Sequence, residues 1–223
     1  MIITHEAFTN IYNVDSKIFN KLLDGVSKVN TFINRIDKLS TAYLTYGYSD
    51  KKTANGIETG DNKMKGDIFE IFAESFLKIA GTHPTIGVYG YKPIHSTEDN
   101  GVDGIGLGID GKPLTVQVKF RSDSTMELIA EDLKQFGFQS IVNYDVDKTT
   151  KTNMVLFTCG KGMHWHTEHD VFLDRIRTIG IDILEYTTNN NIPFWKSLAD
   201  MIENTVIASY NQTIIDKFTK IKI

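Results

Sequence analysis

The segment 101–120, GVDGIGLGIDGKPLTVQVKF, places three side chains suited to phosphate chemistry in an otherwise apolar strand pattern. Asp103 supplies a carboxylate, Gln117 supplies an amide oxygen, and Lys119 supplies an ammonium group. Oxygen ligands suit Mg²⁺, and a lysine stabilises the charge that builds up when a phosphate is attacked. If the fold brings the three side chains together, the segment predicts a divalent-cation site beside a bound phosphate.

Alternation along the strand decides which of these side chains share a face. Thr115, Gln117 and Lys119 point to one side of the strand LTVQVKF, because successive side chains alternate. The other side carries only apolar residues, namely Leu114, Val116, Val118 and Phe120. A buried lysine needs a partner for its charge, and Asp103 in the preceding strand is the partner we expect.

The turn between the two strands tests this arrangement. A two-residue turn at Asp110 and Gly111 would set Asp103 opposite Val118, on the apolar face and away from Lys119. The site therefore requires a bulge, a bend or an odd-length loop, and we expect a register break between residues 103 and 119. The alternative interpretation is structural: an ordinary Asp-Gly turn with a surface pair of opposite charges. Residues that favour a distortion are Gly104, Gly106, Gly108 and Pro113.

The spacing of apolar residues predicts the elements that must hold this hairpin. Helices are expected over Asp15–Leu44, over 65–81, from Ser124 or Thr125 to about Phe136, after Thr167 as far as Gly180, and from Pro193 onward. Strands are expected near Ile86–Tyr91, in the buried run NMVLFTCG (153–160), and in IDILEY (181–186). The polar stretch 46–63 is predicted to be a loop or linker. This order predicts an α/β fold in which helices flank a mixed central sheet.

The composition is that of a soluble globular protein, with 223 residues, 41% hydrophobic and 23% charged. No apolar run is long enough to span a membrane, and the N-terminus lacks a signal-peptide pattern. One cysteine, Cys159, excludes a disulfide framework within the chain, favours a reducing cytoplasm, and is expected to be a buried thiol. The net charge of −4 argues mildly against a nonspecific nucleic-acid coat but allows a local basic groove.

Four stretches in order, KGDIFEIFAESFLKIAG (65–81), GVDGIGLGI, LTVQVKF and NMVLFTCG, resemble the catalytic domain of Mrr-type restriction endonucleases. These enzymes belong to the PD-(D/E)XK nuclease superfamily, so the resemblance implies a restriction-endonuclease-like sheet with added N- and C-terminal helices. The predicted helix after Thr167 and the predicted IDILEY strand also follow the family order. We therefore predict an N-terminal helical region and loop (1–62), a nuclease core (63–190) and a C-terminal helical extension (191–223).

The resemblance also implies a role for each site residue. Asp103 corresponds to the metal-ligating aspartate, and Gln117 takes the position of the superfamily's second acid, as in Mrr-type members. The Val118 carbonyl is expected to be a further metal ligand, and Lys119 corresponds to the catalytic lysine. Glu70 corresponds to the helix acid that helps bind the metal, directly or through water.

One residue departs from the motif of the superfamily. Val102 stands where the motif name has proline, a departure that the superfamily often shows.

Four basic residues near the motif are expected to contact DNA phosphates, since lysine and arginine supply most nonspecific affinity. For each of them the alternative interpretation is an ordinary solvated surface charge. They are Lys65, Lys92, Arg121 and Lys161.

The function that we expect is metal-dependent hydrolysis of DNA phosphodiester bonds, with Mg²⁺ or alternatively Mn²⁺ as cofactor. DNA is the expected partner, with a second copy of the chain or a larger helicase or translocase as further partners. The expected location is the cytoplasm of a bacterial or phage-infected cell, without membrane association. Three alternatives stay open: a Holliday junction resolvase, a nuclease module of a larger helicase or translocase, and an inactive DNA-binding or assembly module.

Overall fold

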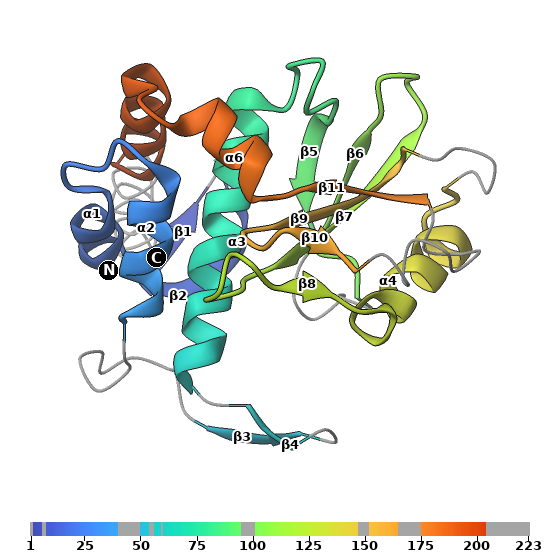
Figure 1. Cartoon of the computed structure of the whole chain (residues 1–223), viewed down its shortest axis with the longest axis horizontal. Helices are drawn as coiled ribbons and strands as arrows, with labels where there is room; N and C mark the ends of the chain where they lie inside the picture. Colours follow the sequence, from blue (N-terminus) through green and yellow to red (C-terminus); the bar gives the residue numbers. More distant parts are fainter. Residues whose placement is uncertain are drawn as a thin grey trace, which may run out of the picture.

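A computed structural model describes residues 2–5, 8–39, 50–53, 56–58, 60–94, 101–146, 152–164 and 175–203. Its largest sheet has five strands in the order β11-β9-β7-β6-β5 (Figure 1). The strands β5 (Tyr89–Pro93), β6 (Gly104–Leu107) and β7 (Pro113–Lys119) form an antiparallel meander. The strands β9 (Met154–Thr158) and β11 (Ile176–Ile179) continue the sheet in parallel with β7. The predicted α/β fold with a mixed sheet flanked by helices is therefore confirmed.

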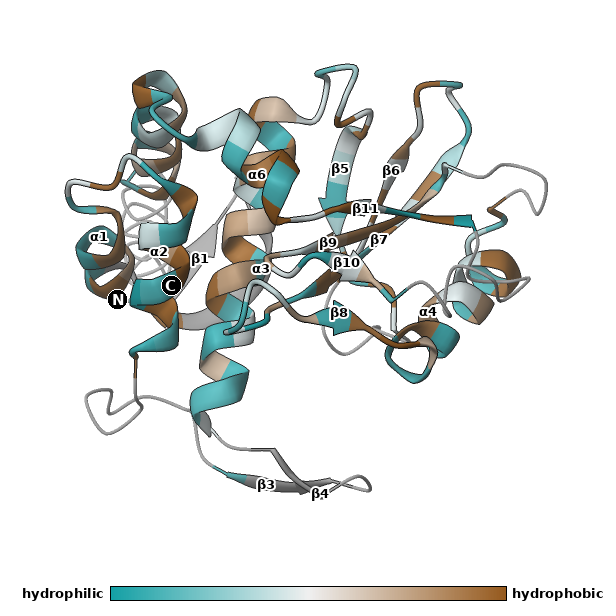
Figure 2. Cartoon of the chain, in the orientation of Figure 1, coloured by the Kyte–Doolittle hydropathy of each residue, from teal (hydrophilic) through white to brown (hydrophobic). Residues whose placement is uncertain are grey.

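Helices bury both faces of this sheet. The helix α3 (Gly60–Ala80) packs on the face that carries Val155 and Phe157 of β9. The helix α4 (Ala130–Asn143) packs on the opposite face, with Met154 and Leu156. Side chains alternate along β9, so both faces of this strand are covered and all five of its residues are buried. The same strand is hydrophobic along most of its length in Figure 2.

The N-terminal part differs from the single helix predicted over Asp15–Leu44. Two antiparallel strands, β1 (Ile2–His5) and β2 (Phe8–Asp15), precede two short helices, α1 (Ser16–Leu23) and α2 (Val29–Asp37). Gly25 has a φ of +63°, a left-handed conformation that interrupts the helix between them. The guanidinium of Arg35 then donates to the carbonyls of Leu22 (2.9 Å) and Asp24 (2.6 Å), which satisfies the end of α1.

The loop predicted over 46–63 is wrong where the structure describes it. Strands β3 (Lys51–Thr53) and β4 (Gly56–Glu58) form a hairpin that projects beyond the N-terminal end of α3 (Figure 1). Helix α3 begins at Gly60, whose N–H donates to the Asp50 carboxylate at 2.9 Å. A carboxylate at a helix N-terminus satisfies a free amide and favours this early start. Residues 46–49, 54–55 and 59 lie outside the described residues.

The predicted strand at Ile86–Tyr91 begins three residues later, at Tyr89, because the N–H groups of Ile86 and Gly87 bond to His83 in a turn. The helix predicted from Ser124 or Thr125 to Phe136 begins instead at Ala130. Asp123 accepts bonds from the backbone and hydroxyl of Thr125, and this local turn competes with helix formation. A short strand, β8 (Glu127–Leu128), follows and pairs in parallel with β10 (Gly162–Met163).

The last elements of the predicted core also differ from those expected from the sequence. The helix expected to reach Gly180 is absent over 176–179, which form β11, and residues 165–174 lie outside the described residues. The predicted strand IDILEY is instead the helix α6 (Ile181–Thr188). Its buried residues Ile181, Leu184 and Thr188 are three and four positions apart, which matches a helix face. Residues 192–203 are helical, as expected from Pro193 onward, and residues 204–223 lie outside the described residues.

One hydrophobic cluster joins all three predicted segments. Residues 192–203 form the final helix of the described part of the chain. The rings of Phe32 on α2, Phe72 on α3 and Trp195 in this final helix lie 5.0–6.4 Å apart, centroid to centroid. Phe194, Leu198 and Ile202 belong to the same cluster. The boundaries at 62 and 190 stay a prediction, since the core is continuous across both. In the part of the chain that the structure describes, we find no helix with the length and hydrophobicity needed to cross a membrane.

Candidate functional site

The hairpin between β6 and β7 has an odd-length loop, one of the three arrangements that the site allows, and the expected register break is not found in the ladder that pairs 104–107 with 113–116. Leu107 pairs with Pro113, and the N–H of Gly108 donates to the carbonyl of Lys112 at 2.9 Å. Three residues, 109–111, therefore make the loop. Gly111 bonds back to the Gly108 carbonyl and has a φ of +72°, which corresponds to a tight turn followed by a left-handed residue. This loop shifts the register by one residue from that of a two-residue turn, and it sets Asp103 beside Gln117.

Backbone hydrogen bonds hold Asp103 between two strands. Its N–H donates to the carbonyl of Val116 on β7, and its carbonyl accepts from the N–H of Ile94 after β5, both at 2.9 Å. Its carboxylate oxygen Oδ2 accepts two further bonds at 2.5 Å, from the amide Nε2 of Gln117 and the backbone N–H of Val118. The structure thus brings three of the predicted site residues, Asp103, Gln117 and Val118, into direct contact.

Two more oxygen atoms belong to this contact group. Gln117 is 4% exposed, and within the described residues no donor bonds to its Oε1 atom. The N–H and C=O of one strand residue point to the same neighbouring strand. Since the Val118 N–H points to Asp103, its carbonyl points to that side as well. The carboxylate, the amide and the carbonyl together are an oxygen-donor set of the kind that suits Mg²⁺.

Lys119 lies at the end of the same strand, two residues after Gln117 and on the same face. Its carbonyl accepts from the hydroxyl of Thr158 at 2.8 Å, which ties the end of β7 to the end of β9. The expected ion pair with Asp103 does not form, because Asp103 bonds to Gln117 and Val118 instead. Lys119 is half-buried, and none of the ion pairs in the described part of the chain includes its ammonium group.

Glu70 comes to this end of the sheet on α3. The ring of the preceding residue, Phe69, contacts the rings of Phe120 at 5.7 Å and Phe157 at 5.6 Å. These contacts seat the helix on the face of β7 that carries Val118, whereas Gln117 and Lys119 point to the opposite face. Glu70 itself is half-buried, and the two donors that hold the Asp103 carboxylate come from β7 rather than from α3. A metal-ligating role for Glu70 stays a prediction.

Two of the four basic residues predicted to contact DNA have acidic partners. Lys65 on α3 pairs with Asp37 of α2 at 3.3 Å. Arg121, just after β7, lies 3.5 Å from Asp132 at the start of α4 and donates to the Phe120 carbonyl. Sequence spacing does not predict these ion pairs, because each acid lies on a different element from its basic partner. Both pairs lower the positive potential that the sequence alone predicts.

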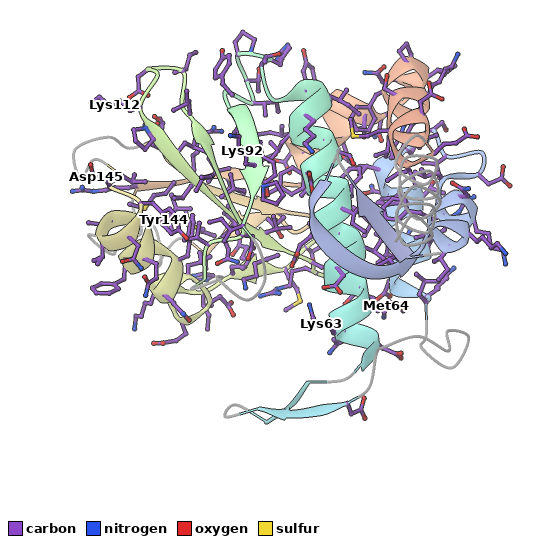
Figure 3. All side chains as sticks on the ribbon, turned by 180° about the vertical axis from the view of Figure 1, so that it is seen from behind. Lys63, Met64, Lys92, Lys112, Tyr144 and Asp145 are labelled. Carbon is purple, nitrogen blue, oxygen red and sulfur yellow. The ribbon has the colours of Figure 1, made fainter. Side chains whose placement is uncertain are left out.

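The other two basic residues lie on different elements. Lys161 is exposed just after β9, where its N–H bonds to the Met126 carbonyl. Lys92 is exposed on the edge strand β5, opposite Ile105 of β6 (Figure 3). Arg121 and Lys161 thus follow the carboxyl ends of β7 and β9, whereas Lys92 belongs to the edge strand of the sheet. A role in DNA contact stays a prediction for all four residues.

Cys159 holds the chain that leaves β7. Its thiol accepts from the Arg121 N–H at 3.1 Å and donates to the Arg121 carbonyl at 3.0 Å. The side chain is buried, as predicted, and burial raises the pKa of the thiol to about 11. At neutral pH the thiol is therefore a neutral hydrogen-bonding group rather than a nucleophile.

Within the described residues, no three His, Cys, Asp or Glu side chains gather in a way that could hold a metal ion. The Asp103 group falls outside this description because two of its three oxygen donors are an amide and a backbone carbonyl. No protein-family model matches the sequence, and no curated protein is significantly similar to it. The site is therefore interpreted from its own geometry.

Proposed function

We propose that this chain is a metal-dependent DNA endonuclease of the Mrr-like, PD-(D/E)XK type. One observation carries the proposal. The carboxylate of Asp103 contacts the Gln117 amide and the Val118 backbone, and Lys119 follows on the same strand without an acidic partner among the described residues. The resemblance assigns metal-binding and catalytic roles to these residues, and their position on two adjacent strands supports the proposal.

The element order up to β9 supports the proposal. A long helix (α3) is followed by three antiparallel strands (β5, β6 and β7), the two-residue strand β8, a helix (α4) and a buried parallel strand (β9). The four stretches that resemble Mrr-type enzymes lie on these elements, and the two motif segments are adjacent strands. The resemblance is weaker after β9, where residues 176–179 of the expected helix form a strand and the expected IDILEY strand is a helix. Residues 165–174, the rest of the expected helix, lie outside the described residues.

The donor atoms fit a magnesium ion. One carboxylate, one amide oxygen and one carbonyl leave room for water and for a phosphate oxygen in an octahedral shell. A bound Mg²⁺ would supply Lewis-acid polarisation of the scissile phosphate. Lys119 would stabilise the negative charge that develops on the phosphate during attack. Because Gln117 is neutral, the site has one negative charge fewer than a site with two acids, so we expect weak binding of the metal in the absence of DNA.

Cleavage of supercoiled plasmid DNA tests the proposal directly. The full chain is incubated with Mg²⁺ or Mn²⁺, with EDTA as the metal-free control. Lys119→Ala removes the catalytic charge, and Lys196→Ala removes an exposed lysine of the final helix as a matched control. Nicking or linearisation that needs metal and Lys119, but not Lys196, supports the proposal. Equal cleavage by both variants contradicts it.

A second candidate is a DNA-binding module that does not cleave. One observation favours it: among the described residues, no group of three His, Cys, Asp or Glu side chains could hold a metal ion. Retained binding with no cleavage of plasmid, methylated, branched or single-stranded DNA would support this candidate. Cleavage confined to branched DNA would instead indicate a junction resolvase.

A further inference from the structure

Arg177 on β11 donates to two backbone carbonyls. Its Nε atom donates to the Thr152 carbonyl at 2.8 Å, and one terminal nitrogen donates to the Gly87 carbonyl at 3.1 Å. A guanidinium group has five N–H donors, so these two bonds leave three for other partners. In the part of the chain that the structure describes, no aspartate or glutamate pairs with Arg177. A partly buried cation without an acidic partner is unusual.

The same guanidinium lines a small pocket of about 140 Å³. The pocket lies where the turn before β5 meets the β6–β7 loop and the start of β9, and Figure 1 shows that turn and that loop at the same end of the sheet. Lys112, labelled in Figure 3, directly follows that loop. Besides Arg177, the lining residues include Pro84, Gly87, Ile109 and Asn153.

The charges around this pocket favour an anion. Burial lowers the pKa of Arg177 to about 10, so the group stays positively charged at neutral pH. The carboxylate in the bordering loop, Asp110, accepts bonds from the Lys112 N–H at 3.0 Å and the Asn153 amide at 3.2 Å. The Lys112 N–H is the main cause that holds the pKa of Asp110 below its usual value. Asp110 is therefore engaged by its own loop and by Asn153.

We propose that this pocket binds a small oxyanion, either a phosphate or a carboxylate group, through the Arg177 guanidinium. The planar fork of an arginine matches both groups, which accept two parallel N–H bonds. At about 140 Å³ the pocket is smaller than the roughly 300–1,000 Å³ of sites for drug-sized ligands, so a small anion suits it better than a nucleotide. Asp103 bonds to the carboxyl end of β7, whereas this pocket adjoins the loop at its amino end. The two sites are therefore separate, and neither proposal depends on the other.

Calorimetric titration of the full chain with inorganic phosphate, and separately with acetate, tests the proposal at constant ionic strength in chloride. We expect a dissociation constant on the order of 1 mM for at least one of the two anions, as befits a ligand of few atoms. Saturable binding of phosphate alone identifies a phosphate site, and saturable binding of acetate alone identifies a carboxylate site. No saturable binding of either anion overturns the proposal.

Variants locate the binding. Arg177→Gln is expected to weaken binding at least about tenfold, since a charge-assisted bond is lost. Arg177→Gln also removes two hydrogen bonds to backbone carbonyls. Two further variants are therefore made at Ile109, which borders the pocket and is 67% exposed. Ile109→Glu places a negative charge at the pocket and is expected to weaken binding about tenfold, whereas Ile109→Gln keeps the wild-type affinity. Equal affinities of the two Ile109 variants would show that the anion binds elsewhere.

Discussion

The side-chain amide of Gln117 donates to Oδ2 of Asp103 at 2.5 Å, although the two residues are 14 positions apart in the chain. The contact exists because a three-residue loop sets the β6–β7 register. Val118 adds a second donor to the same oxygen. Two donors on one oxygen hold the carboxylate in one orientation, which is what a metal ligand requires.

Replacing the neutral partner with an acid tests whether a metal binds between these residues. Gln117→Glu sets two carboxylates against each other, so without metal we expect the free energy of unfolding to fall by about 1–3 kcal/mol. With millimolar Mn²⁺ the added charge strengthens binding, and the loss should be reversed. Thermal unfolding in EDTA and in Mn²⁺ measures both. Gln139→Glu on α4 is the control; an equal loss for Gln117→Glu in both conditions would exclude a metal at this position.

The loop that sets the register depends on a left-handed residue. Gly111→Ala is expected to lower the free energy of unfolding by about 1–2 kcal/mol, because an L-residue is strained at a φ of +72°. Gly66→Ala, in the interior of α3 with open space around it, is expected to raise stability by about 0.5–1 kcal/mol. Urea unfolding compares the two. If Gly111→Ala leaves stability unchanged, the loop does not need this conformation.

Cys159 makes stability depend on alkaline pH. Its folded-state pKa of about 11 is above the ordinary value of 9.0, so the unfolded chain loses this proton first as pH rises. The stabilisation is complete below pH 9 and is lost between pH 9 and pH 11, on the order of 3 kcal/mol in all. Unfolding curves of wild type and Cys159→Ala should therefore converge across this window. Parallel pH profiles of the two proteins would contradict the buried thiol.

Trp195 anchors the final helix in the central core. Its Nε1 donates to the Thr188 carbonyl at 2.8 Å, and its ring packs against Phe32, Phe72 and Phe194. Trp195→Ala is expected to cost about 3–5 kcal/mol in unfolding free energy, and Trp195→Phe about 1–2 kcal/mol for the lost hydrogen bond. Tyr186→Ala, at a side chain that is 78% exposed, should stay within about 0.5 kcal/mol of wild type. A Trp195→Ala protein as stable as wild type would mean that the final helix is dispensable.

Sequence reasoning succeeded where periodicity was long or burial was complete. The helix over 65–81 and the strand in NMVLFTCG were predicted because their apolar patterns extend over many residues. The parity of Asp103 and Lys119 required a bulge, a bend or an odd-length loop, and the structure has the last of these. The six residues IDILEY were too short to distinguish helix from strand, and a left-handed Gly25 inside a regular apolar pattern gave no warning of a break.

The candidate site was predicted only in part, because some of its contacts are made between elements that are distant in sequence. Asp103, Gln117 and Val118 meet because two adjacent strands pair locally. The acids that neutralise Lys65 and Arg121, Asp37 and Asp132, come from elements whose packing no spacing reveals. The expected partner of Lys119 was also wrong, because hydrogen bonds within the hairpin engage Asp103 first. Local pairing was therefore accessible from the sequence, whereas tertiary charge pairing was not.

The packing of Trp195 against α3 also delays completion of the hydrophobic core during synthesis on the ribosome. The phenylalanines of α3 end at Phe76, but their cover includes Phe194, Trp195 and Ile202, which are translated 118 to 126 residues later. At roughly 5–20 residues per second, that interval is about 6 to 25 s. During this time the nascent chain exposes an aromatic surface, which is the kind of surface that chaperones bind. The need for chaperones during synthesis is therefore expected to depend on the helix at residues 192–203, which is far in sequence from the residues that are proposed to carry out the chemistry.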